Sequence, residues 1–127
     1  MKTSVSKIMH LGVFSKNKMK RYLNLVDKKL EINPTPESVE KLFLLAVEDF
    51  KNGEISVSEL SGVCNYLWPI SLKIQDFKRD TSELSVILLV GAEMEYYLKD
   101  TENKRKENSK IFDSSLKEIL SYKSKLS

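Results

Sequence analysis

The stretch KLFLLAVEDFKNGEISVSEL, residues 41–60, decides the fold because it contains the end of one helix, a turn and the start of the next helix. The apolar residues in and just before it recur at helical spacing, at Val39, Leu42, Phe43, Ala46, Val47 and Phe50. This pattern predicts an amphipathic helix over about 36–51 with one face toward a core. Thr35 can cap this helix, and Pro36 fits its first turn, where no helical amide is needed.

A short turn follows this helix at Asn52-Gly53. Glycine readily adopts the left-handed conformation that ends many helices, so the apolar stripe stops here. Ser56 and Glu59 then have the spacing of a capping box, in which each side chain accepts a hydrogen bond from the other residue's amide. The pattern predicts a second helix that runs to about Leu67, and therefore a helical hairpin.

The same stretch also looks like half of an EF-hand calcium loop, with Gly53 at position six and Glu59 at position twelve. Counting back places Glu48 at position one, Phe50 at three and Asn52 at five. Phenylalanine offers no oxygen ligand, and Phe50 belongs to the apolar face of the preceding helix. We therefore interpret the stretch as a turn and expect no metal.

One further helix is predicted before this hairpin and another after it. Ser15 can cap the first, and Pro34 ends it because proline cannot continue a helix interior. The apolar face of this helix is formed by Met19, Tyr22, Leu23, Val26 and Leu30. Downstream, the segment 80–83 (DTSE) repeats the cap-plus-glutamate pattern and predicts a helix to about Lys99.

Two segments interrupt the predicted helices. Trp68-Pro69 must bend or end the second helix of the hairpin, because proline lacks an amide donor and disfavours helix in the residue before it. A continuation to about Phe77 stays open. Residues 100–111 are highly charged and lack apolar anchors, which predicts a loop. Asp113-Ser114-Ser115 then predicts the start of a last helix, with one apolar face formed by Leu116, Ile119 and Leu120.

These elements indicate an all-α protein. No segment alternates polar and apolar residues as a strand would, and 127 residues is a usual size for one domain. We expect a single helical domain over residues 1–127, folded as an antiparallel bundle of four to six helices. Residues 1–14 show no clear period, which leaves either a short helix or a loosely ordered arm.

The residues needed for catalysis or metal binding are scarce. His10 is the only histidine, and Cys64 is the only cysteine, so neither a zinc site of the usual kind nor a His-based catalytic pair can be assembled. The four scattered glycines form no phosphate-binding loop. Glu93 and Glu95 lie about 200° apart around a helix and do not converge as an acid and a base. We expect a protein that is not an enzyme and has no metal or cofactor, with Cys64 in the core.

The net charge of +3 hides an uneven distribution. Residues 1–31 have eight basic and two acidic side chains, residues 32–100 have six and twelve, and residues 101–127 have seven and four. An acidic middle favours a basic protein partner and a basic end favours nucleic acid, although a plain solvated surface explains either. A single cysteine, no signal-peptide pattern and no membrane-spanning apolar run predict a cytoplasmic protein that does not bind membranes.

The segment 84–98 is apolar almost all round. One side has Leu84, Ile87, Leu88, Gly91, Met94 and Leu98. The other side has Val86, Leu89, Val90, Tyr96 and Tyr97, around Glu93 and Asp100. One interpretation is a central helix buried by neighbours on both sides. The other is a partner surface, because tyrosine combines a large contact area with a polar tip and carboxylates attract a basic protein.

The second candidate partner is nucleic acid, which would make the protein a small helical adaptor. The basic residues that could follow a phosphate backbone are Lys16, Lys18, Lys20, Arg21, Lys28 and Lys29. No helix-turn-helix glycine turn or RNA-binding aromatic pattern accompanies them, and lysines are ordinary on the wet face of an amphipathic helix. A protein partner is therefore the preferred interpretation.

One family has a similar arrangement of motifs. The stretch LFLLAVEDFKNGEISVSELSGVCNYLW, then ILLVGAEMEYYLKD and IFDSSLKEIL, resembles the colicin-D-like bacterial immunity proteins over about residues 36–120. The likeness lies in a helix that ends at a short turn, a long helix with an acidic and aromatic end, and an acid-capped closing helix. The resemblance implies a compact helical protein that binds and blocks a cognate toxin domain, often a nuclease, without catalysing a reaction.

The resemblance also implies a partner surface. Acids on the long helix would take the place of the phosphates that a basic nuclease cleft expects and would speed encounter with the toxin. The expected surface consists of Asp76, Asp80, Glu83, Glu93, Glu95, Tyr96, Tyr97 and Asp100.

Overall fold

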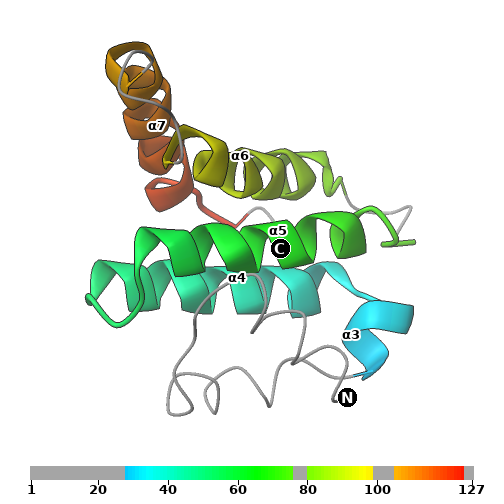
Figure 1. Ribbon diagram of the computed structural model, residues 1–127. Coiled ribbons are helices and arrows are strands. Elements are labelled where there is room, and N and C mark those ends of the chain that lie inside the picture. Colours follow the sequence, from blue (N-terminus) through cyan, green and yellow to red (C-terminus); the bar gives the residue numbers. More distant parts are fainter. Residues whose placement is uncertain (1–27, 76–79, 99–104, 125–127) are drawn as a thin grey trace.

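The computed structural model describes residues 28–75, 80–98 and 105–124, in which five helices occur (Figure 1). They are α3 (Lys28–Ile32), α4 (Pro36–Lys51), α5 (Val57–Ser71), α6 (Ser82–Leu98) and α7 (Arg105–Leu120). Those ranges contain no strand. The prediction of an all-α bundle of four to six helices is confirmed, and buried side chains of all five helices belong to one apolar core.

Helix α4 begins and ends where the sequence predicts. The Thr35 hydroxyl accepts a hydrogen bond from the Ser38 amide (3.1 Å), and the Ser38 hydroxyl accepts one from the Thr35 amide (3.0 Å). Pro36 occupies the first turn. At the other end Asn52 is the C-cap, and Gly53 has a φ of 74°, in the left-handed region that favours glycine.

Helix α5 begins with the predicted capping box. The Ser56 hydroxyl accepts from the Glu59 amide (3.1 Å), and a Glu59 carboxylate oxygen accepts from the Ser56 amide (2.9 Å). Glu59 is buried, and its carboxylate accepts from a backbone amide. The interpretation of this stretch as a turn between two helices is therefore confirmed.

Helix α5 does not end near Leu67. The alternative left open, a continuation past Pro69, is observed, although the helix ends at Ser71 and not near Phe77. Pro69 is exposed and lies in the last turn, where its missing amide removes one helical hydrogen bond. The two residues beyond it, Ile70 and Ser71, are buried, so packing holds the final turn in place.

The predicted start of the last helix is also wrong. Helix α7 begins at Arg105, and Asp113 lies inside it, so the second half of the expected charged loop is helical. Arginine, lysine and glutamate have high helix propensities, which a loop prediction based on charge alone overlooks. Residues 1–27, including most of the predicted helix from Ser15, lie outside the described residues. The last part of that predicted helix is α3, where Leu30 is buried.

Helix α5 lies in the middle of the bundle, with α4 on one side and α6 on the other (Figure 1). Helix α7 is steeply inclined to α6 and packs against it. Six consecutive residues of α5, 59–64, are buried, so this helix has neighbours all round. The interpretation of the segment 84–98 as a helix buried on both sides is wrong, since Val86 and Glu93 on α6 are exposed.

Small residues allow α5 and α6 to approach closely. The Ser61 hydroxyl donates to the Gly91 carbonyl across the interface (2.7 Å). A β-carbon added at Gly91 would lie 2.8 Å from the Cys64 β-carbon and closer still to its sulfur. Cys64 is fully buried, as predicted, and burial raises the pKa of its thiol to about 12. The thiol therefore acts as a small packing group at this crossing.

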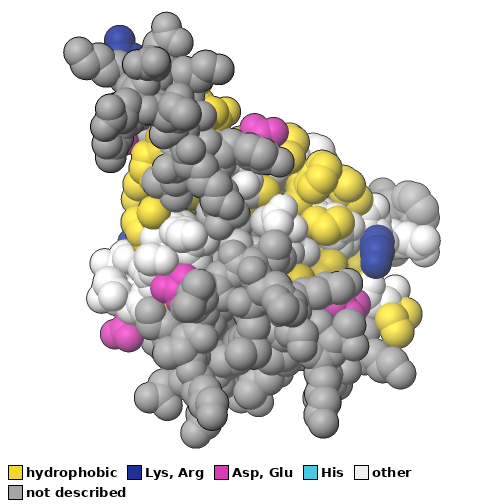
Figure 2. All heavy atoms as spheres, in the orientation of Figure 1, with side chains coloured by type: hydrophobic (Ala, Val, Ile, Leu, Met, Phe, Trp, Pro, Cys, Tyr) yellow, Lys and Arg dark blue, Asp and Glu magenta, His cyan; other side chains and the backbone are white. Residues whose placement is uncertain are grey.

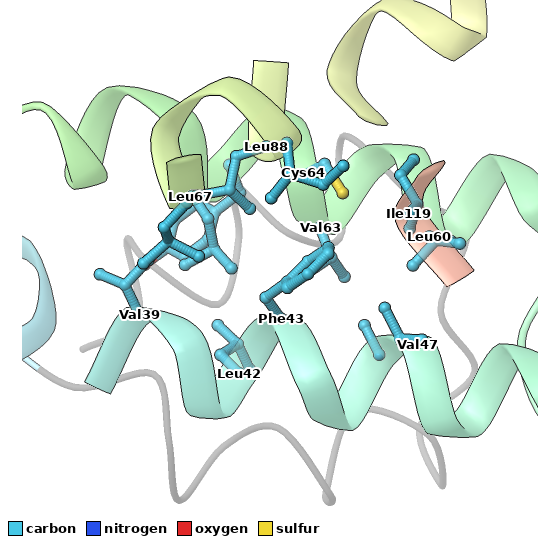
Figure 3. Close-up of a cluster of buried hydrophobic side chains, with 14 of the residues drawn as sticks. Val39, Leu42, Phe43, Val47, Leu60, Val63, Cys64, Leu67, Leu88 and Ile119 are labelled. Carbon is cyan, nitrogen blue, oxygen red and sulfur yellow. The ribbon is translucent and has the colours of Figure 1, made fainter. Parts of the chain in front are cut away.

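The core lies between α4 and α5 and is closed by α6 and α7. Figure 3 shows Phe43 of α4 directed toward α5, close to Val63, and Ile119 of α7 beside Leu60. The chain after α7 returns to α4, where the rings of Phe43 and Tyr122 meet edge to face with centroids 5.4 Å apart. This contact ties the carboxyl end of the described chain to the hairpin.

Candidate binding surface

Four residues of the expected partner surface have described side chains, namely Asp80, Glu83, Glu93 and Tyr97. Asp76 and Asp100 lie outside the described residues. Glu95 and Tyr96 belong to α6, but their side chains lie outside the described part of the chain. The expected site is therefore assessed from residues of α6 and the turn before it.

Asp80 has a structural role at the start of α6. One of its carboxylate oxygens accepts from the Ser82 amide (2.9 Å) and from the Ser82 hydroxyl (2.6 Å). An acid beside the first turn also interacts favourably with the helix dipole. Asp80 is exposed, so this role leaves the carboxylate in contact with solvent.

Glu83, Glu93 and Tyr97 lie on one face of α6 together with two valines. At 100° per residue, Glu83, Val86, Val90, Glu93 and Tyr97 fall within about 80° of one another. We call these five residues the outer α6 stripe. It extends about 21 Å along the helix, because fourteen residues separate its ends. The structure therefore brings three of the expected site residues onto one line.

The outer α6 stripe combines carboxylates with accessible apolar surface. Glu83 and Glu93 are exposed, Val86 is 59% exposed, and Val90 and Tyr97 are half-buried. Figure 2 shows hydrophobic side chains gathered over α6 with an acidic side chain among them. A surface of this kind can bury apolar area against a partner and attract basic groups at the same time.

A groove extends the stripe toward α7. It encloses about 430 Å³ and is lined by Glu83, Val86, Ile87, Glu118, Ser121, Tyr122 and Lys123. Sequence reasoning did not single out Glu118 or Tyr122. The sequence around these two residues does not indicate a site, because the groove forms only when the end of α7 packs beside the first turns of α6.

Tyr122 connects this groove to the core. Its hydroxyl donates to a Glu40 carboxylate oxygen (2.8 Å), and the Ser124 hydroxyl donates to the other Glu40 oxygen. The pKa of Tyr122 is raised far above its ordinary value, first by burial, then by the hydrogen bond to Glu40, and then by the charges of Glu40 and Glu83. The phenol therefore stays protonated and continues to donate to Glu40.

The second expected site cannot be assembled from the described residues. Lys16, Lys18, Lys20 and Arg21 lie outside them, and so does the side chain of Lys28. Lys29 is described and exposed on α3. Binding of nucleic acid by the basic segment stays a prediction.

Within residues 28–75, 80–98 and 105–124, no group of three or more His, Cys, Asp or Glu side chains is placed to hold a metal ion. None of the helices in those ranges combines the length and apolar character needed to cross a bilayer.

Comparison of the chain with protein-family models, with curated proteins and with solved structures gives no match. The residues from which function can be inferred are therefore those of the outer α6 stripe and the adjoining groove.

Proposed function

We propose that the protein is a non-catalytic inhibitor of the immunity type, which binds a bacterial toxin domain in the cytoplasm and neutralises it. The observation behind the proposal is the outer α6 stripe, where the exposed Val86 lies between Glu83 and Glu93. The resemblance of residues 36–120 to colicin-D-like immunity proteins supplies the kind of partner, and the stripe supplies the surface.

The physical argument concerns how such a surface would block a toxin. A nuclease cleft is basic because it binds phosphates, so a line of carboxylates attracts it and occupies the positions of phosphate groups. Val86 and Val90 add apolar contact, which is not screened by salt. Inhibition then follows from covering the cleft, without any reaction on the inhibitor.

The experiment is protection of growing cells. The proposal implies that a toxin domain is encoded beside this gene, so the full chain is co-expressed with that domain and growth is followed after induction. The wild-type chain should restore growth, and the double substitution Glu83→Lys and Glu93→Lys should abolish protection because both charges then repel a basic cleft.

Glu48→Lys is the matched control. Glu48 is exposed on α4, on the opposite side of α5 from α6, so the substitution makes the same type of charge reversal away from the stripe. This variant should still protect. Equal protection by the control and the double variant would contradict the proposed surface, and a wild-type chain that fails to protect would contradict the proposed function.

A further inference from the structure

The groove between α6 and the end of α7 has an acidic side chain on each of its two walls. Glu83 stands on the α6 wall and Glu118 on the α7 wall. Both carboxylates belong to exposed residues. The apolar part of the lining comes from Val86, which is largely exposed, and Ile87, which is buried. The groove therefore presents an acid on each wall, together with apolar side chains on the α6 wall.

We propose that this groove receives one arginine side chain of the protein partner, an inference that rests on the proposed function and deepens it. The guanidinium pairs with the carboxylates of Glu83 and Glu118, because its five donors can serve two acceptors at once. The methylene stem of the arginine lies along Val86 and Ile87, as the stems of long basic side chains do on apolar surface. The volume of about 430 Å³ has room for one such side chain.

The charges around the groove favour a cation over an anion. Behind it, the Glu40 carboxylate accepts from Tyr122, and the charges of Glu40 and Glu83 both act on the phenol. Because the Tyr122 proton is directed to Glu40, the phenol oxygen is left as an acceptor. Lys123 is the one basic side chain in the described lining, and it competes with an incoming arginine.

Arginine fits better than lysine for a geometric reason. The planar guanidinium offers several donors in fixed directions, whereas the lysine ammonium is a compact and strongly hydrated charge. A shallow groove open to water favours the more weakly hydrated cation. The groove would thus select the partner by one anchoring residue, while the rest of the outer α6 stripe supplies general charge attraction.

The test uses the full chain and a defined probe, N-acetyl-arginine methylamide. Backbone amide resonances are followed by NMR during titration with this probe and with the citrulline analogue, which has nearly the same shape and no charge. The arginine probe should shift the amides of residues 83–87, 118 and 121–123 progressively, and the citrulline probe should shift them much less.

Three variants locate the binding. Replacing Glu83 and Glu118 together by glutamine should weaken binding of the arginine probe about threefold to tenfold, since an exposed ion pair contributes up to a factor of about five. Lys123→Met should strengthen it, by removing the competitor. Glu48→Gln is the matched control and should leave the affinity unchanged.

The inference is overturned if the arginine probe shifts none of these amides up to its solubility limit, or if citrulline shifts them equally. It is also overturned if the double glutamine variant, which retains a native spectrum, binds the probe as well as the wild type.

Failure of the inference can be distinguished from failure of the proposed function. Protection from the toxin together with no binding of the probe rejects the arginine groove alone. Binding of the probe without protection rejects the inhibitor proposal and the assignment of the arginine to a toxin.

Discussion

Helix α6 has an inner and an outer face with different surroundings. On the inner face Leu88 is fully buried, and Gly91 lies so close to α5 that an added β-carbon would overlap Cys64. On the outer face Val86 is 59% exposed among acids. The apolar residues of this helix therefore serve packing mainly on the inner face, whereas Val86 on the outer face stays accessible. We infer that the other side is available for a partner.

The largest expected effect on stability comes from shortening a side chain to alanine on the inner face of α6, compared with the same change on the outer face. Leu88→Ala should lower the free energy of unfolding by about 2–5 kcal/mol, because it removes buried methyl groups and leaves a cavity. Val86→Ala, two residues away, should change it by less than about 0.5 kcal/mol, because the side chain is mostly in water. Urea unfolding followed by circular dichroism measures both, and similar losses would break the distinction between the faces.

The next effect concerns the close crossing of α5 and α6. Gly91→Ala should destabilise the protein by about 2 kcal/mol, because the new β-carbon overlaps Cys64, an effect larger than the gain of about 1 kcal/mol in helix propensity. On a Cys64→Ala background the same substitution should be less harmful, since the sulfur is gone. Equal losses on the two backgrounds in chemical denaturation would show that the Cys64 sulfur is not the main obstacle, since alanine keeps the Cys64 β-carbon.

A smaller effect is expected where the groove meets the core. Tyr122→Phe should cost about 1–2 kcal/mol, because the buried Glu40 loses one of its two hydroxyl donors. Unfolding in urea at neutral pH gives this value. A loss below about 0.3 kcal/mol would show that Tyr122 and Glu40 contribute little to holding the chain after α7 on α4.

Tyr122→Phe should also differ from the wild type in how its stability depends on pH. The ordinary tyrosine pKa is 10.0 and that of Tyr122 is raised, so the folded state holds this proton more tightly. The resulting stability is fully present below about pH 10 and is lost as pH rises through the raised pKa. The wild type should therefore lose stability above pH 10 more steeply than Tyr122→Phe, and parallel pH profiles would contradict the assignment.

The smallest expected effect is at the N-cap of α5, which lies away from both faces of α6. Ser56→Ala should lower the free energy of unfolding by about 1 kcal/mol, because the hydroxyl that accepts from the Glu59 amide is lost. Ser56→Gly should lower the free energy of unfolding by only a few tenths of a kcal/mol relative to the wild type. If alanine is as well tolerated as glycine in thermal unfolding, the capping box has little energetic weight.

The hairpin could be predicted from the sequence because its determinants are local. The cap at Thr35, the turn at Gly53 and the box of Ser56 and Glu59 each depend on residues within a few positions. The start of α7 at Arg105 is not predicted by charge, because a dense run of charged residues indicates a loop even where those residues have high helix propensity.

The candidate site was only partly predictable. Two of its acids and Tyr97 were expected from the helical pattern of α6, whereas the groove depends on pairs far apart in the chain. The Tyr122 hydroxyl and Glu40 are separated by 82 positions, and Ser61 and the Gly91 carbonyl by 30. The small residues at 61, 62 and 64 are a sequence signal for a close helix crossing on α5, and Ser61 and Cys64 meet Gly91 of α6 there.

The most direct measurement is the affinity of the purified chain for the neighbouring toxin domain, determined by calorimetry for Glu93→Lys and Glu48→Lys. Both substitutions change the net charge equally, and both positions are exposed on helices. We predict that Glu93→Lys weakens binding at least about tenfold, or 1.4 kcal/mol, while Glu48→Lys stays within about twofold of the wild type. Equal affinities of the two variants would contradict the assignment of the outer α6 stripe as the binding surface.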